Sequence, residues 1–368
     1  MKAGKVLAGM ILLGALILGA GLAGCVLPPE EQNKDYPDYV APPHVPSVVG
    51  AFHPFTADPS DTTDYNVIQS IPPNGAASIN NNMAITFFFT DMIDKTTIND
   101  FGVRIYANKK PVYGTYIGTL TTKNNTVMSF VPYEPFPFGA FVEVAIIRSP
   151  LGLLDKGGNQ IVSNYRTTFS AIAGVLPSAD ANLSLESDTT GYVCSGDCAV
   201  ISTPFGGISA TNGTKVAVIT SANSPLVGAQ ASIKNTTSLI SSGAINVPPG
   251  MTHLSFDYKF ISAEFMEYIG STFDDTFLTS IVGPNDNYAD ITDSVNLIGE
   301  NTPGILFATA FPGMPDTGDS FAGETPWITE TIDVSALGSP IYVTFIASDV
   351  GDTIYSSIVV LDNLRFSP

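Results

Sequence analysis

The 368-residue sequence predicts an all-β protein with two β-sandwich domains, preceded by a signal peptide and a disordered linker. Short runs of β-branched and aromatic residues recur along residues 66–368, and several of them alternate apolar with polar side chains. Glycine and proline, with 33 and 27 residues, separate these runs, and helix-type periodicity is scarce. At about 100–200 residues per domain, a chain of this length accommodates two domains.

The N-terminus has the order of a secretory signal peptide. Lys2 and Lys5 precede an apolar stretch over residues 6–22, which ends in small residues and Cys25. With a cysteine at the cleavage position, the segment resembles the lipobox of bacterial lipoproteins. The resemblance implies that residues 1–24 are removed and that Cys25 carries a lipid in the bacterial cell envelope. The alternative is an ordinary signal peptide or membrane anchor that contains a cysteine by chance.

Residues 25–65 form the expected linker. Eight prolines lie between Pro28 and Pro59, interleaved with acidic residues and tyrosines. A segment of this composition cannot bury a core, so we expect an extended or disordered spacer. About 40 residues of coil span roughly 35 Å, which would lift the folded part off the membrane.

Residues 66–171 are expected to form the first sandwich. Strand-like runs cover residues 84–89 and 141–147, and turn residues such as Asn74-Gly75 separate them from others. In the order of its motifs, from Ser70–Gly75 to Asp155–Asn159, the segment resembles the bacterial Ig-like domain of S-layer and other surface proteins. The resemblance implies a spacer or adhesive module without catalytic residues.

Residues 190–368 are expected to form the second sandwich, of the jelly-roll type. In the run 254–260, Phe256, Tyr258 and Phe260 share one face of a strand, and the intervening polar residues take the other. Through residues 256–277, 348–352 and 361–363 the domain resembles the choice-of-anchor family of bacterial secreted modules. That resemblance implies a jelly-roll fold and leaves the function open.

Two cysteines remain after the leader, in the sequence Cys194-Ser-Gly-Asp-Cys198. In an exported chain, such a pair forms a disulfide more often than a metal site. A metal would need further soft ligands, and no histidine lies nearby.

An acidic set in the second domain is the candidate metal site. Ca²⁺ binds six to eight oxygens, which carboxylates and carbonyls supply. Six residues could contribute to a structural calcium site if the strands bring them together: Glu264, Asp274, Asp275, Asp349, Asp352 and Asp362. The alternative is a set of solvated loop carboxylates, because Asp is common in turns.

Catalytic and carbohydrate-binding motifs are sparse. The three histidines fit no catalytic pattern, so we predict no catalytic residues and a protein that is not an enzyme. Paired carboxylates such as Glu264 and Glu267 leave glycoside hydrolysis as an alternative. Trp327, the single tryptophan, is the candidate ligand-binding platform for a sugar, although a lone tryptophan is more often a partly buried anchor.

The net charge of −19 excludes whole classes of partner. Such a surface repels nucleic acids and anionic headgroups, so a lipid must hold the chain to a membrane. The sequence therefore predicts a lipid-anchored surface protein for adhesion or binding, with a polysaccharide, matrix or surface protein as partner. An envelope glycan hydrolase and a structural component of a surface layer or filament are the alternatives.

Overall fold

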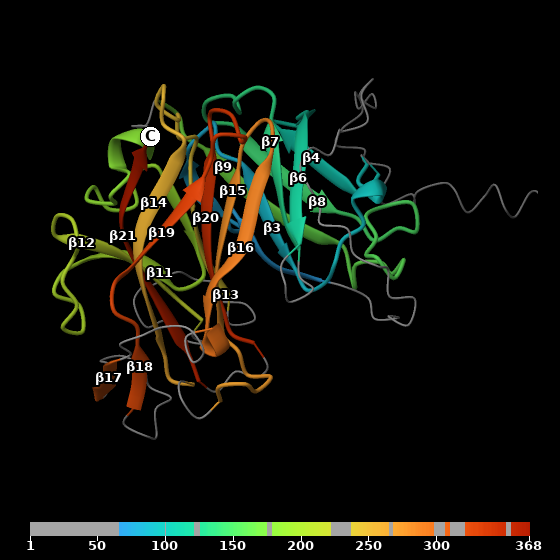
Figure 1. The fold of residues 1–368 in the computed structure, drawn as a ribbon. Coiled ribbons are helices and arrows are strands. Elements are labelled where there is room, and N and C mark those ends of the chain that lie inside the picture. Colours follow the sequence, from blue (N-terminus) through green and yellow to red (C-terminus); the bar gives the residue numbers. More distant parts are fainter. Residues whose placement is uncertain are drawn as a thin grey trace, which may run out of the picture. The chain divides into compact units, whose positions relative to one another are not determined.

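The computed structural model describes residues 66–99, 101–120, 126–174, 179–221, 237–264, 268–297, 306–309, 321–350 and 355–368. The leader, the lipidation site Cys25, the linker 25–65, Glu267 and Asp352 lie outside these residues. The described residues are nearly all β, which confirms the all-β prediction (Figure 1). No helix among them has the length and apolar character needed to cross a membrane.

The first sandwich contains strands β1 to β9. One sheet has the order β1-β3-β7-β6 and the other β2-β9-β8-β4-β5, with β2 and β9 the parallel pair. Phe87, Phe89 and Phe130 are fully buried between them, because alternate residues of each strand point inward. The strands are β1 (Val67–Ile71), β2 (Ala76–Ile79), β3 (Ile85–Phe89), β4 (Val103–Ala107), β5 (Lys110–Pro111), β6 (Gly114–Leu120), β7 (Thr126–Pro132), β8 (Phe141–Ile146) and β9 (Tyr165–Ala171).

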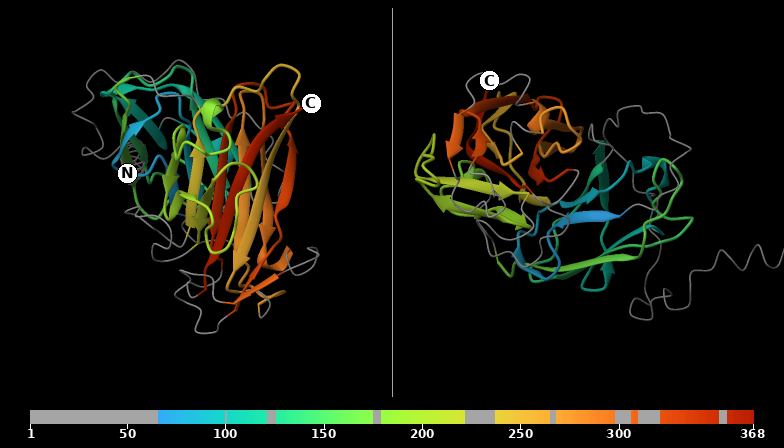
Figure 2. Two further views of the ribbon diagram at one scale, coloured as in Figure 1. Left: turned by 90° about the vertical axis from the view of Figure 1, so that its left-hand side faces the viewer. Right: turned by 90° about the horizontal axis from the view of Figure 1, so that it is seen from below.

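The second sandwich contains β10 to β21 in two antiparallel sheets. The β13 sheet has the order β10-β13-β20-β15-β16, and the β14 sheet contains β11-β12-β21-β14 with β19 and the β17–β18 pair beside β14. The dark red β21 runs along the gold β14 (Figure 1; Figure 2, left). The strands are β10 (Tyr192–Ser195), β11 (Cys198–Ser202), β12 (Lys215–Thr220), β13 (Thr237–Ser242), β14 (His253–Ser262), β15 (Thr276–Val282), β16 (Asn287–Ser294), β17 (Leu306–Thr309), β18 (Phe321–Glu324), β19 (Ile328–Asp333), β20 (Tyr342–Ser348) and β21 (Ser357–Ser367).

Strand β14 contributes three aromatic side chains to the core of the second sandwich. Phe256, Tyr258 and Phe260 lie in one hydrophobic cluster between the two sheets, on the shared face that the alternation predicts. The ring of Phe256 stands edge-on to that of Phe345, with centroids 4.9 Å apart. Burial of such rings supplies much of the folding free energy, at about 1.5–3 kcal/mol for each fully buried large side chain.

The β13 sheet is buried on both faces. One face lies against the core with Phe256, and on the other Leu239, Leu278 and Ile346 belong to the hydrophobic cluster of the first sandwich. Gln69 Nε2 also donates to the Thr237 carbonyl across this contact, at 3.2 Å. The two sandwiches therefore share packing within one compact unit of the chain, which goes beyond the spacer expected from the sequence.

Candidate functional site

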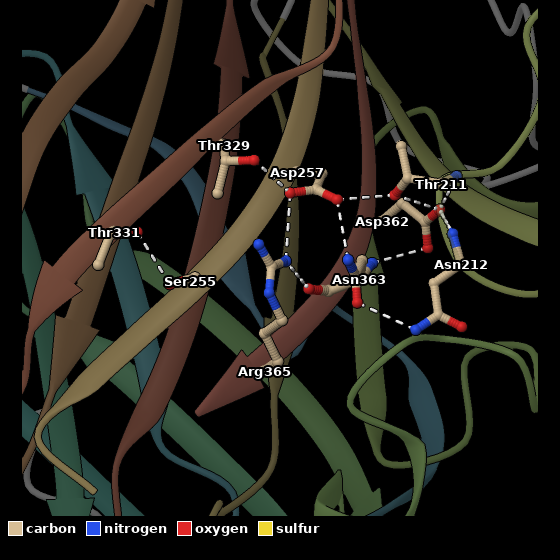
Figure 3. A network of polar contacts seen from close by, with 9 residues as sticks. All are labelled: Thr211, Asn212, Ser255, Asp257, Thr329, Thr331, Asp362, Asn363 and Arg365. Carbon is tan, nitrogen blue, oxygen red and sulfur yellow. Dashed lines mark hydrogen bonds and ion pairs between the residues drawn. The ribbon is translucent and has the colours of Figure 1, made fainter. Parts of the chain in front are cut away.

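Two carboxylates face each other on the outer face of the β14 sheet. Asp257 of β14 pairs with Asp362 of β21 in the strand register, next to an irregularity between Ser255 and Asp257 (Figure 3). Neighbouring residues of both strands point into the core, so these two carboxylates point away from it. The outer face is nevertheless covered: Asp257 is 6% exposed and Asp362 is fully buried.

Every carboxylate oxygen of this pair accepts hydrogen bonds. Asp362 Oδ2 accepts the backbone N–H groups of Thr211 and Asn212 at 2.6 and 2.8 Å. Its Oδ1 accepts the N–H of Asn363 at 2.7 Å. The donors to Asp257 are Thr329 Oγ1 at 2.7 Å, Asn363 Nδ2 at 2.9 Å and Arg365 Nη1 at 3.1 Å, together with Thr211 Oγ1 at 2.8 Å.

The Thr211 hydroxyl lies between the two carboxylates. Its Oγ1 is 2.8 Å from Asp257 Oδ2 and 3.0 Å from Asp362 Oδ2, although a hydroxyl has a single proton to donate. Burial raises the pKa of Asp362, and hydrogen bonds from Asn212 and Thr211 offset this only in part. Burial also acts to raise the pKa of Asp257, but its hydrogen bonds outweigh that effect and lower the pKa.

This network is a structural brace. It holds Thr211 and Asn212, which follow a loop whose Ile208 packs on the outer face of the sheet. Buried carboxylates with this many donors have their lone pairs used, so they are poor candidates for metal ligation or proton transfer.

Four of the predicted calcium ligands meet at one end of the second sandwich. Asp275 accepts Val350 N–H at Oδ1 and Ser221 Oγ at Oδ2, both at 2.9 Å, and its own N–H donates to Glu264 Oε2 at 3.4 Å. Asp274 Oδ1 accepts the N–H of Asn296 at 2.9 Å. Asp349 directly precedes Val350.

Asp362 does not belong with that set. Ser357, opposite the end of β14, marks the Glu264 end of β21, and Asp362 lies five residues further on, about 16 Å along the strand. The expectation of one six-residue site is therefore wrong for Asp362, which pairs with Asp257. Within the described ranges, no three His, Cys, Asp or Glu side chains are grouped so that they could hold a metal ion.

A buried acid inside the sandwich has no place in the sequence predictions. Asp293 of β16 is 4% exposed, and its Oδ2 accepts the Tyr258 hydroxyl at 3.1 Å. Burial raises the pKa of Asp293 to about 6, and the charges of Asp274 and Glu330 add to the rise. Burial likewise raises the pKa of Tyr258. Asp293 is close enough to the acidic end for the charge of Asp274 to act on it, and its inward position follows only from the strand register.

A disulfide joins Cys194 and Cys198, whose Cα atoms are 5.9 Å apart, between β10 and β11. Gly196, between them, has φ +89°, and a Cβ there would come within 2.8 Å of the Ser238 Cα. The turn thus requires glycine at this position.

Trp327 is half-buried. It packs against the apolar residues on the outer face of the β14 sheet, among them Val216, Val218 and Ile261. A half-buried tryptophan in such contacts anchors a loop to the sheet. The sugar-binding role predicted for Trp327 remains a prediction.

A pocket of about 530 Å³ lies where residues of the two sandwiches meet, and no sequence motif predicts it. Two of its lining residues, Ala244 and Tyr342, form a small buried apolar cluster with Ala84. Both sandwiches contribute to its lining: Asn82, Thr115, Ile117, Val131, Pro132, Tyr133, Pro135, Ala244, Asn246, Pro284, Pro340 and Tyr342.

Comparison with known proteins identifies the first sandwich. A sequence model of the bacterial Ig-like domain matches residues 61–171, which confirms the resemblance for that part of the chain. No curated protein matches the chain. The match does not extend to the second sandwich.

Several solved structures are similar to the chain at low sequence identity. TmCBM61 in complex with beta-1,4-galactotriose is 10% identical, covers 50% of this chain and 94% of its own, and has a TM-score of 0.27. The N-terminal part of the bacterial S-layer protein SbsC is 11% identical, covers 49% and 40%, and has a TM-score of 0.24. The adhesin domain of Lys-gingipain from Porphyromonas gingivalis W83 is 16% identical, covers 49% and 95%, and has a TM-score of 0.25.

Proposed function

We propose that this chain is a bacterial cell-surface protein, held to a membrane by a lipid on Cys25, that binds polysaccharide or matrix without cleaving it. The leader, the small residues before Cys25 and the linker 25–65 support export and anchoring. The bacterial Ig-like domain over residues 61–171 supports a surface setting.

The observation that favours binding over hydrolysis is the engagement of the carboxylate pair. A glycosidase needs one carboxyl group that protonates the leaving oxygen and a second that attacks or activates water. Asp257 and Asp362 face each other, but their oxygens accept hydrogen bonds from the surrounding loop and strands. This pair therefore stabilises the fold and supplies no acid–base couple. The pair that the sequence offers for hydrolysis, Glu264 and Glu267, includes a residue outside the described ones, so the assay below decides that alternative.

The test is a glycan array probed with the purified full chain in detergent, followed by a reducing-end assay on every glycan that binds. We expect binding of at least one polysaccharide-derived oligosaccharide and no new reducing ends. New reducing ends would support the hydrolase instead, and an array without any bound glycan would overturn polysaccharide as the ligand.

Structural calcium at the acidic end is a separate part of the proposal. The sequence supports it through Glu264, Asp274, Asp275, Asp349 and Asp352, which would supply oxygens there. The described side chains are not grouped around an ion, so binding would require them to turn toward it. A bound ion stabilises the folded state by mass action, so the melting temperature should rise when Ca²⁺ is added to chelator-treated protein. A melting temperature that is unchanged by Ca²⁺, with Mg²⁺ as the control, would remove the ion from the proposal.

A further inference from the structure

The pocket between the two sandwiches has an uncharged lining among the described residues. None of those lining residues is Asp, Glu, Lys, Arg or His, although the chain as a whole carries a charge of −19. Its volume of about 530 Å³ lies within the usual size of ligand sites. A pocket without a charge, in an acidic protein, favours a neutral ligand and disfavours an anionic one.

Two tyrosines give the pocket aromatic surface at different depths. Tyr133, directly after β7, is 57% exposed and lines the pocket. Tyr342, at the start of β20, is 8% exposed, and burial raises the pKa of its hydroxyl to about 12. The hydroxyl of Tyr342 therefore keeps its proton at neutral pH, and the Tyr133 ring offers a flat apolar face.

The polar side chains of the pocket are the amides of Asn82 and Asn246 and the hydroxyls of Thr115, Tyr133 and Tyr342. Asn82 Oδ1 is buried and accepts no hydrogen bond within the part of the chain that the structure describes. Asn246 is held in place by Asp180, which accepts its N–H and its Nδ2 at 2.6 and 2.7 Å.

We infer that this pocket binds a neutral sugar unit of a polysaccharide, with the apolar face of the sugar ring on Tyr133 and its hydroxyl groups bonded to the amides and hydroxyls of the lining. The inference rests on the proposed polysaccharide binding and assigns it to the contact between the sandwiches. Sugars combine an apolar ring face with many hydroxyl groups, which is the combination of surfaces that the pocket presents. Both sandwiches are then needed for the site.

The experiment measures affinity by isothermal titration of the purified full chain in detergent. The probes are neutral tetrasaccharides of glucose, mannose and galactose, with tetragalacturonate as the charged counterpart. The variants are Tyr133→Ala and Asn82→Ala. Tyr113→Ala is the matched control, because Tyr113 is 42% exposed and does not line the pocket, and Trp327→Ala tests the other aromatic candidate.

We expect one neutral tetrasaccharide to bind more tightly than tetragalacturonate. Tyr133→Ala and Asn82→Ala should each raise its Kd by about tenfold or more, with Tyr113→Ala and Trp327→Ala near wild type. Because Tyr133 is exposed, its replacement should leave the melting temperature unchanged, so this variant decides the question even if Asn82→Ala folds poorly.

The remaining outcomes contradict the inference in different ways. Wild-type affinity in both pocket variants would move the site elsewhere while polysaccharide binding stands. A loss of affinity in Trp327→Ala alone would place the sugar-binding site on the outer face of the β14 sheet. No binding of any neutral or charged glycan would overturn the proposed polysaccharide ligand itself. Binding of a proline-rich peptide with the sequence of residues 28–46, lost in Tyr133→Ala, would show that the pocket takes polyproline instead.

Discussion

Replacing Asp257 with alanine tests the brace on the β14 sheet. The Asp257 carboxylate accepts hydrogen bonds from Thr211, Asn363, Thr329 and Arg365, so the change removes one acceptor from four donors. The Thr211 hydroxyl keeps Asp362 as its acceptor, 3.0 Å away. The loss is therefore concentrated on the other three donors.

The expected loss of unfolding free energy depends on whether water can replace the carboxylate at each of the three donors. Thr329 is exposed and Arg365 is partly exposed, so water can replace the carboxylate at both. Asn363 Nδ2 is less accessible and loses a charge-assisted bond, worth about 1.5–3 kcal/mol. We expect Asp257→Ala to lower the free energy of unfolding by about 2–3 kcal/mol in total. For a domain of this size the melting temperature should fall by about 4–12 °C.

Urea denaturation at pH 7, followed by tyrosine fluorescence and circular dichroism, measures the change. Arg365→Ala is the control, because its side chain is 40% exposed and such an ion pair contributes about 1 kcal/mol or less. The lowered pKa of Asp257 sets the pH dependence. Its stabilisation is present above the unfolded-state pKa and is lost as pH falls through the folded-state pKa, so the difference from wild type should shrink in acid. Equal losses in the two variants would refute the reasoning.

Three further predictions concern other parts of the chain. Asp293→Asn should raise the free energy of unfolding at neutral pH and flatten its pH dependence between pH 3.8 and about 6. The folded protein binds the Asp293 proton more tightly than the unfolded chain, so the wild type loses about 3 kcal/mol of stability as pH rises through that window. Urea midpoints at several pH values measure the effect, and an unchanged pH dependence would contradict the raised pKa of Asp293. Replacing Cys194 and Cys198 with serine should cost about 2 kcal/mol because the closed loop is short, and wild-type protein treated with reductant should match the variant in urea denaturation. Cys25→Ser should abolish incorporation of labelled palmitate by expressing cells, and retained label would exclude lipidation at this residue.

The alternation of β14 shows what local sequence predicts well and where it stops. Phe256, Tyr258 and Phe260 share the core face as expected, because side-chain direction in a strand depends only on position. The opposite face carries Asp257 and Lys259, as the alternation predicts, but these side chains are only 6% and 7% exposed. Thr211 and Thr329 contact Asp257, and Thr325 and Glu324 contact Lys259, and no pattern within β14 predicts these contacts.

The candidate sites depend on contacts that the sequence does not display. Asp362 was grouped with Glu264 by composition, whereas the register of β21 on β14 places it beside Asp257. The pocket brings Asn82 and Tyr133 together with Tyr342, more than 200 positions away in the chain. The sequence shows only that Tyr133 lies between Pro132 and Pro135, and the packing of the two sandwiches is what places it at the pocket.

Binding without hydrolysis is the central claim, and one titration tests it most directly. The purified full chain is titrated with the best neutral tetrasaccharide, and the recovered sugar is analysed by mass spectrometry. We expect saturable binding that Tyr133→Ala weakens and a tetrasaccharide that is recovered intact. Recovery of shorter sugars, or saturable binding that Tyr133→Ala leaves unchanged, would contradict it.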